Sequence, residues 1–410
     1  MIVNEYIKQF ERLGFGMFVH FGLYSVHGKG EWAHSRNITI EDYAALFHHF
    51  NPHKDWAKDL VATAKQAGCK YITLTTRHHD GFSLYDTCGL SDYDAPHCTA
   101  GRDLVREFVD ACNTESIIPF FYHTLLDWYV PSFREDFPEY LKYLRRSVEI
   151  LCTNYGKIGG IWFDGKWSKP NDDWEEDALY GLIRKYQPTA MIINNTGLDA
   201  LGQLGHIELD SVTFERGRPS PINLECSPKY VASEMCEIFA DHWGYAKYDF
   251  AYKSLATIIE EFCECRRYGA NMLLNIGPMG DGTIRPLDKA MLETLGEWVD
   301  IYKEALYLPR PSGIKISGNA KDFLLKGDNC YYLFVHNLPV GGDQNVVKDP
   351  NQNPHTDTFT LPEKVKSIHW IDNGQEVYFV ENGSSVSVCP KNQIYGENLV
   401  VKVAKIDIEC

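Results

Sequence analysis

Residues 71–80 read YITLTTRHHD, an apolar run rich in β-branched residues that ends in polar side chains. The same arrangement recurs at residues 117–123 (IIPFFYH) and 160–164 (GIWFD). Longer stretches of helical period lie between such runs, and in residues 140–155 apolar side chains recur at spacings of three and four. This alternation, which extends from about residue 14 to residue 305, predicts repeated βα units around a parallel sheet.

Eight strands are expected in this region, together with helices over 55–67, 102–113 and 140–155. The expected strands are residues 16–20, 71–75, 117–122, 160–163, 191–194, 211–214, 235–239 and 272–276. Eight such units predict an α/β fold of the (β/α)8, TIM-like barrel type. A doubly wound open sheet is the alternative, but the sequence has no glycine-rich nucleotide loop of the GxGxxG or GxxxxGK type.

The pattern changes after a helix expected over residues 287–305. Short alternating segments follow at 322–326, 330–336, 367–371 and 376–380, which predict a small antiparallel β-sandwich. We expect a linker at residues 308–313, and therefore a barrel domain over residues 1–308 and a β-sandwich domain over residues 309–410. Two domains also suit a chain of 410 residues, because one hydrophobic core rarely grows that large.

Composition restricts the partners of the chain. A formal net charge of −16 disfavours nucleic acid and anionic membrane surfaces. No export signal is visible at the N-terminus, and no apolar run reaches the roughly 18 residues of a membrane span. The 12 cysteines are scattered and show no CxxC pair. We therefore expect a cytoplasmic protein with reduced thiols, no metal and no cofactor, and the sequence leaves a homo-oligomer open.

Polar residues that close the strands of such a barrel gather at one end of it, where these barrels place their active sites. In this sequence they are His20, His78, His79, Tyr122, His123, Asp164 and Glu215, while Glu234 stands near the start of its run, and Glu31 and Trp32 follow the first strand. Two carboxylates that flank a bond are what glycoside hydrolysis needs. Asp164, which precedes a glycine, suits the ionised role.

Each of these residues also has a structural alternative. Asp164 taken alone could cap a turn, and a lone histidine is as often a core residue as a ligand. A second alternative is a metal site formed by His20, His78, His79, Asp164 and Glu234. Metal-dependent barrels usually carry an HxH pair on the first strand, whereas here that strand ends in His20-Phe21-Gly22. The metal alternative is therefore the weaker one.

Six motifs in order resemble the α-L-fucosidases of glycoside hydrolase family 29. They are GFGMFVHFGLYS (14–25), GKGEW (28–32), ITLTTRHHDGF (72–82), GGIWFDG (159–165), SEMC (233–236) with DHWGY (241–245), and NMLLNIGPMGDGTI (271–284). The resemblance implies a retaining exo-α-L-fucosidase that acts on fucosylated oligosaccharides or glycoconjugates by double displacement, without a cofactor. Asp164 would be the nucleophile.

The resemblance also implies roles for the other strand-end residues. Fucose would be bound by His20, Glu31, Trp32, His78, His79 and Tyr122, with Trp162 packed against the sugar. The acid/base would be Glu234 of the SEMC segment, with Glu215 as the second candidate because a serine, Ser233, stands where the family commonly has tryptophan. Around Thr196 many members carry an arginine that steadies the sugar or the nucleophile; here either Arg216 or Arg218 replaces it or this contact is missing. A non-catalytic fucose-binding protein and a metal-dependent barrel hydrolase remain as alternatives.

Overall fold

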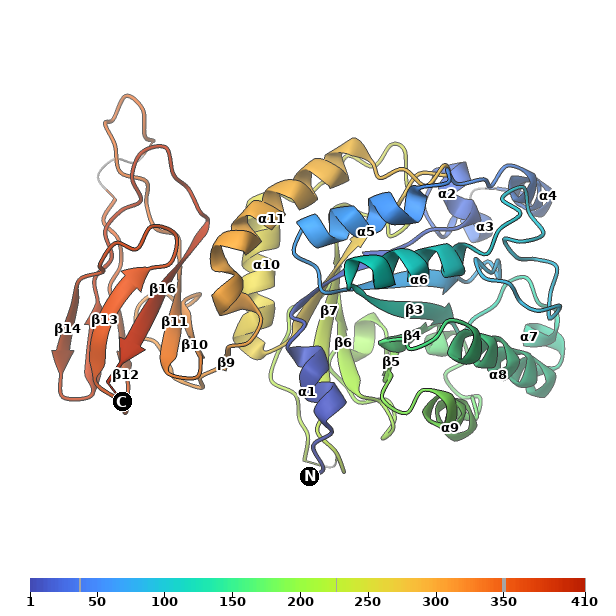
Figure 1. The fold of residues 1–410 in the computed structure, drawn as a ribbon, viewed down its shortest axis with the longest axis horizontal. Coiled ribbons are helices and arrows are strands. Elements are labelled where there is room, and N and C mark those ends of the chain that lie inside the picture. Colours follow the sequence, from blue (N-terminus) through green and yellow to red (C-terminus); the bar gives the residue numbers. More distant parts are fainter. Residues whose placement is uncertain (37, 226, 349–351, 410) are drawn as a thin grey trace. The chain divides into compact units, whose positions relative to one another are not determined.

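The computed structural model describes residues 1–36, 38–225, 227–348 and 352–409 (Figure 1). The chain divides into two compact units, one of residues 1–253 and 270–293 and the other of residues 254–269 and 294–410. Helix α10 (Leu255–Tyr268) belongs to the second unit although it lies between two barrel strands in the sequence. The boundary that we expected at residues 308 and 309 lies inside this second unit and stays a prediction.

The first unit is built on a closed barrel of eight parallel strands. In order they are β1 (Phe15–Val19), β2 (Tyr71–Arg77), β3 (Ile118–Thr124), β4 (Gly160–Asp164), β5 (Met191–Asn194), β6 (Ser211–Glu215), β7 (Ala232–Ile238) and β8 (Asn271–Ile276). Each strand pairs with the next along the chain, and β8 pairs with β1 to close the ring. The predicted (β/α)8 barrel is confirmed, and β7 begins three residues earlier than expected.

Amphipathic helices connect the strands of the barrel. They include α5 (Trp56–Gln66), α6 (Leu104–Glu115), α8 (Phe137–Asn154) and α9 (Glu176–Tyr186). In α8 the predicted stripe of Leu141, Leu144, Val148 and Leu151 is buried. Residues at these spacings share one face of a helix, so the apolar pattern fixes which face packs inward.

One end of the barrel is filled by apolar side chains. Helix α1 (Glu5–Glu11) contributes Ile7 and Phe10 to a buried cluster with side chains of the strands. The Phe10 ring lies 5.6 Å from the ring of Tyr71, at the start of β2, and 5.7 Å from that of Phe120 in β3. This packing lies at the amino ends of the strands, away from the carboxyl ends where the site residues are expected.

The second unit contains two antiparallel sheets. One has the order β13-β16-β11-β10-β9 and the other β12-β15-β14. Their bounds are β9 (Arg310–Pro311), β10 (Phe323–Lys326), β11 (Cys330–His336), β12 (Asp357–Thr360), β13 (Val365–Trp370), β14 (Phe379–Asn382), β15 (Ser385–Val388) and β16 (Val401–Ile408). The predicted β-sandwich is confirmed. The segment 308–313, which we expected to be a linker, contains strand β9, and this strand pairs with β10.

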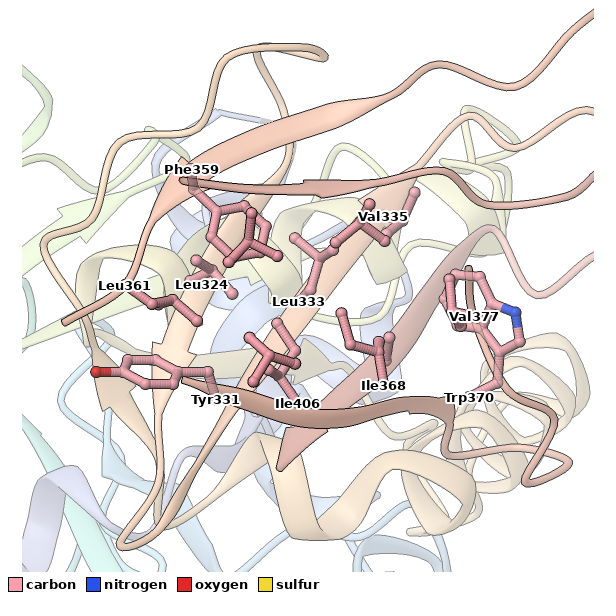
Figure 2. Close-up of a cluster of buried hydrophobic side chains, with 14 of the residues drawn as sticks. Leu324, Tyr331, Leu333, Val335, Phe359, Leu361, Ile368, Trp370, Val377 and Ile406 are labelled. Carbon is pink, nitrogen blue, oxygen red and sulfur yellow. The ribbon is translucent and has the colours of Figure 1, made fainter. Parts of the chain in front are cut away.

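Figure 2 shows the buried cluster that holds the sandwich together. Leu333 of β11, Phe359 of β12, Ile368 of β13 and Ile406 of β16 belong to it, so both sheets contribute side chains. In β15 the buried Val386 and Val388 alternate with serines, which turns one face of its sheet toward the core, whereas six of the seven residues of β11 are buried. Among the described helices of the chain, none is both long and apolar enough to cross a membrane.

Leu333 is fully buried in the sandwich core, so its truncation should destabilise the second unit. We expect Leu333→Ala to lower the free energy of unfolding by about 2–5 kcal/mol, because the lost side chain leaves a cavity. Denaturant unfolding of the full chain would measure this change. The control is Val380→Ala at a β14 position that is 48% exposed, where an effect within about 1 kcal/mol is expected. Equal losses in both variants would contradict this assignment of the core.

Candidate active site

A cavity of about 740 Å³ opens at the carboxyl ends of the barrel strands. Nine of the ten expected site residues line it: His20, Glu31, Trp32, His78, His79, Tyr122, Trp162, Asp164 and Glu215. The structure thus gathers side chains that are almost 200 positions apart in the sequence. Glu234 is the expected site residue that does not line the cavity within the described structure.

Asp164 is the last residue of β4, and the local backbone fixes where its carboxylate lies. The next residue, Gly165, has φ +98°, and a Cβ there would come within 2.8 Å of Leu126. Glycine is therefore needed at this position both for conformation and for space. The Asp164 carboxylate enters the cavity and keeps 15% of its side chain exposed.

Four side chains surround the Asp164 carboxylate. Oδ2 accepts a hydrogen bond from the Tyr122 hydroxyl at 3.1 Å and lies 3.4 Å from Nε2 of His79. Oδ1 accepts from Nε1 of Trp167 at 3.3 Å and from Nδ2 of Asn195 at 3.2 Å. Burial by itself raises the pKa of Asp164, but the interactions with His79, Tyr122 and Asn195 outweigh it and lower the pKa. Asp164 is thus held as an ionised carboxylate.

Asn195 connects Asp164 to the second carboxylate of the cavity. Its Nδ2 also donates to Oε2 of Glu215 at 2.6 Å. The amide cannot be reversed, since Oδ1 accepts from the Thr213 hydroxyl at 3.1 Å and from the Gly197 backbone N–H at 3.2 Å. The two N–H groups of one carboxamide therefore face the two carboxylates.

The electrostatics of Glu215 are opposite to those of Asp164. Burial, and next the negative charge of Asp164, raise the pKa of Glu215 to about 7. Near neutral pH this carboxyl can hold a proton while Asp164 stays ionised. Two neighbouring carboxyls whose pKa values are pushed apart are the usual arrangement of an acid and a nucleophile.

Glu234, our first choice for the acid/base, lies deeper in the barrel. In the β6–β7 register Glu215 stands opposite Cys236, whereas Glu234 stands opposite Thr213, two residues before the level of Glu215. Its oxygens accept hydrogen bonds from the Tyr71 hydroxyl and from Nε1 of Trp162, the latter at 3.0 Å. Burial raises the pKa of Glu234 to about 7 as well, so position rather than acidity separates the two glutamates. The geometry favours Glu215, the second candidate, over Glu234.

Three of the histidines that line the cavity are held in different ways. Nδ1 of His20 lies 2.6 Å from Oδ1 of Asn275, whose Nδ2 donates to a backbone carbonyl, so Nδ1 of His20 carries the proton. Burial lowers the pKa of His20 to about 3 and also lowers that of His78 well below its usual value. Nδ1 of His79 lies 2.7 Å from the Thr124 hydroxyl. His20 is therefore a neutral imidazole whose Nε2 can accept a hydrogen bond.

The second strand ends two residues later than we expected, at Arg77 instead of Thr75. Strand β2 ends at Arg77, so His78 and His79 both lie beyond it and both line the cavity. His123, by contrast, lies inside β3 next to Tyr122 and faces away from the pocket, with Nε2 2.9 Å from the Ser147 hydroxyl of α8. Neighbouring side chains in a strand point to opposite faces, which explains why Tyr122 and His123 separate.

Aromatic rings and a further buried acid also line the cavity. Trp32 stacks on Trp167 with ring centroids 6.0 Å apart, and Trp243 lies 5.2 Å from His20. The Glu31 carboxylate is 5% exposed and accepts from the Gly244 backbone N–H at 2.7 Å. Trp167 and Asn195 were not predicted as site residues, although Trp167 follows Asp164 by three positions. Their contacts with Asp164 come from turns that the sequence pattern does not specify.

Neither candidate arginine forms a described hydrogen bond or ion pair with Asp164. Arg216 lines the cavity, but its guanidinium lies 3.9 Å from the Asp241 carboxylate. Arg218 is exposed and is absent from the described lining of the cavity. Asn195, which precedes Thr196, occupies the position between the carboxylates instead.

The metal alternative finds no support in the geometry of the pocket. Among the described residues that line this cavity, no three histidine, aspartate or glutamate side chains lie close enough together to share an ion. Glu234, one of the five residues of that alternative, is also engaged by Tyr71 and Trp162 below the cavity.

Comparison with known proteins gives one consistent family. The family model described as Alpha-L-fucosidase matches residues 3–304. The tissue α-L-fucosidase of Mus musculus is 30% identical over 380 residues, which cover 82% of this chain and 79% of that protein. The solved α-L-fucosidase isoenzyme 1 of Paenibacillus thiaminolyticus is 28% identical, with a TM-score of 0.80 over 99% of both chains.

A further solved structure shares the fold at lower identity. It is a trapped covalent intermediate of a family 29 α-L-fucosidase from Bacteroides thetaiotaomicron, in complex with 2-fluoro-fucosyl fluoride. It is 24% identical, has a TM-score of 0.81, and covers 99% of this chain and 97% of that one.

The amide of Asn195 lowers the pKa of both Asp164 and Glu215, so its removal should raise both values. For Asn195→Ala we expect both limbs of the pH profile of kcat/KM on an aryl α-L-fucoside to move up by roughly 0.5–1 pH unit. The matched control is Asn194→Ala, because the Asn194 amide donates to Tyr180 at 2.9 Å and is not part of the cavity lining in the described structure. An unchanged profile in Asn195→Ala would contradict this role of the amide.

Proposed function

The chain belongs to the α-L-fucosidase family, and we propose that it releases terminal α-L-fucose from glycans by double displacement, with Asp164 as nucleophile and Glu215 as acid/base. Its substrates would be fucosylated oligosaccharides or glycoconjugates. The observation that carries this proposal is the pair of carboxylates joined by the Asn195 amide. Net retention at the anomeric carbon follows from the two successive displacements.

The spacing of the two carboxylates supports retention. One nitrogen lies 3.2 Å from Oδ1 of Asp164 and 2.6 Å from Oε2 of Glu215, which keeps those oxygens within about 6 Å of each other. Retaining glycosidases hold their carboxyl groups at about 5–5.5 Å, whereas inverting enzymes leave about 6.5–9.5 Å for a water molecule. A direct attack by water would need the wider gap.

In the first displacement a carboxylate oxygen of Asp164 attacks the anomeric carbon and the glycosidic C–O bond breaks. Glu215 transfers its proton to the departing oxygen. The fucosylated Asp164 is neutral, so the charge that raises the pKa of Glu215 disappears and its carboxylate becomes the stable form. This change of pKa suits Glu215 for both halves of the reaction.

In the second displacement a water molecule attacks the same carbon while Glu215 accepts one of its protons. The bond to Asp164 breaks, and the free sugar leaves with its original anomeric configuration. The covalent intermediate trapped in the Bacteroides thetaiotaomicron protein, which has the same fold, supports this sequence of steps.

The remaining pocket residues would bind the sugar. Neutral His20 offers Nε2 as an acceptor for a hydroxyl, while the Glu31 carboxylate can accept from a vicinal pair of hydroxyls. Trp32, Trp162 and Trp243 present apolar surfaces, which suit the C–H groups of a deoxy sugar. The tyrosine and the histidine that contact Asp164, Tyr122 and His79, would hold the nucleophile in position.

Azide rescue distinguishes the two carboxylate roles. For Asp164→Ala we expect turnover of 4-nitrophenyl α-L-fucoside to fall at least about 1000-fold, because the covalent route is lost. Azide should restore activity and yield the inverted β-fucosyl azide. For Glu215→Ala, azide should instead give the retained α-fucosyl azide.

Glu234→Ala is the comparison that separates the two glutamates. This variant loses a buried acid that binds Tyr71 and Trp162, so its stability should fall, but azide should not change its rate. Rescue with retention in Glu234→Ala, and none in Glu215→Ala, would reverse the assignment.

The pH dependence follows from the raised pKa of Glu215. The acid must be protonated, so kcat/KM should decline as the pH rises through a value of about 7. In Glu215→Gln, assayed with an activated aryl fucoside, the alkaline limb should vanish. Glu234→Gln should keep this limb, and its loss in that variant would contradict the proposal.

A further inference from the structure

The second unit contains a cluster of two carboxylates and an imidazole that fucose hydrolysis does not use. Asp322 immediately precedes β10, Asp357 begins β12, and His355 lies in the segment before it. The side chains of Asp322 and Asp357 are 0% and 1% exposed, and that of His355 is 24% exposed. Buried carboxylates are rare without a cationic partner.

Each carboxylate is anchored through one oxygen. Oδ1 of Asp322 accepts from the His336 backbone N–H at 2.8 Å and lies 3.1 Å from Nδ1 of the same residue. Oδ1 of Asp357 accepts from the Asn319 backbone N–H at 3.3 Å. These bonds fix both carboxylates through Oδ1 and leave Oδ2 of each one for other contacts.

The two remaining oxygens converge on His355. Its Nε2 lies 2.6 Å from Oδ2 of Asp322 and 3.5 Å from Oδ2 of Asp357. These three atoms all lie within 4.8 Å of one another. Oδ2 of Asp357 is buried and has no hydrogen-bond partner among the described residues, so an acceptor points into the cluster without a donor.

A proton on His355 cannot satisfy this arrangement. Its Nε2 lies 2.6 Å from Oδ2 of Asp322, so the N–H of that nitrogen serves this oxygen and leaves Oδ2 of Asp357 without a hydrogen-bond donor among the described residues. A divalent cation would neutralise both carboxylates and provide a partner for the free oxygen.

We propose that Asp322, His355 and Asp357 bind a divalent metal ion of the zinc class. Calcium and magnesium prefer oxygen ligands alone, whereas an imidazole nitrogen with carboxylate oxygens suits zinc. The contacts of His336 with Oδ1 would orient Asp322, because carboxylates that bind a metal are themselves held by hydrogen bonds. Water would complete the coordination on the side where His355 is exposed.

Such an ion would stabilise the β-sandwich and has no part in the proposed hydrolysis. Asp322 adjoins β10 of the five-stranded sheet, and Asp357 belongs to β12 of the three-stranded sheet. Metal binding would therefore link the two sheets and the segment that carries His355. A ligand that binds the folded state alone raises the melting temperature.

The test is a zinc titration of chelator-treated full-length protein, followed by calorimetry, for wild type, Asp357→Asn and His355→Ala. We expect one zinc ion per chain in wild type, with affinity at least about 10-fold lower in each variant. Zinc should raise the melting temperature of wild type by about 4 °C or more and leave that of the variants nearly unchanged. Asp328→Asn, at an exposed position of the same unit, is the control with the same change of charge.

His355→Ala keeps the test decisive if Asp357→Asn fails to fold, because His355 is partly exposed and lies outside the strands. No zinc binding by wild type at about 100 times the protein concentration would overturn the proposal. Equal binding by wild type and both variants would also overturn it, since the ion would then bind at another place in the chain. Fucoside hydrolysis should be the same in all four proteins, so these outcomes do not depend on the catalytic assignments.

Discussion

The site depends on one carboxamide that faces two carboxylates. Asp164 and Glu215 lie in the same buried pocket, where two full negative charges would repel each other strongly. Asn195 gives each of them one N–H, and its own oxygen is held by Thr213 and Gly197. Tyr122 and His79 add contacts to Asp164 alone. This asymmetry separates the two pKa values and leaves one carboxyl ionised and the other protonated.

The barrel makes this arrangement available. Parallel strands end on the same side, so Asp164 at the end of β4 and Glu215 at the end of β6 meet although 51 positions separate them in the sequence. Whether a side chain reaches the cavity depends on its position along the strand as much as on the face to which it points. Glu234 has a raised pKa like Glu215, but it lies two residues lower in the β6–β7 register, where Tyr71 and Trp162 occupy its oxygens. A strand rises about 3.3 Å per residue, so this offset removes Glu234 from the cavity.

Much of this structure could be predicted from the sequence, and the exceptions have physical causes. The eight strands and the stripe of α8 follow from apolar periodicity, which is a local property. The polar residues after each strand indicated the pocket for the same reason. The first choice of Glu234 came from the resemblance of the SEMC segment, whereas the depth of Glu234 in the barrel follows from the β6–β7 register, which no local pattern fixes. Asn195 and the cluster of Asp322, His355 and Asp357 depend on turns and on contacts between distant segments, which no local pattern encodes.

In the proposed reaction Asp164 forms the covalent bond to the sugar, while Glu215 donates and then accepts the proton. The most direct measurement is to treat the Glu215→Gln variant with 2-fluoro-fucosyl fluoride, digest the protein and locate the label by mass spectrometry. The account predicts one 2-fluorofucosyl group per chain, attached to Asp164, because the activated leaving group needs no acid and the slowed second step lets the adduct accumulate. A label on Glu234 or on any other carboxylate, or a fully active enzyme that forms no adduct, would contradict it.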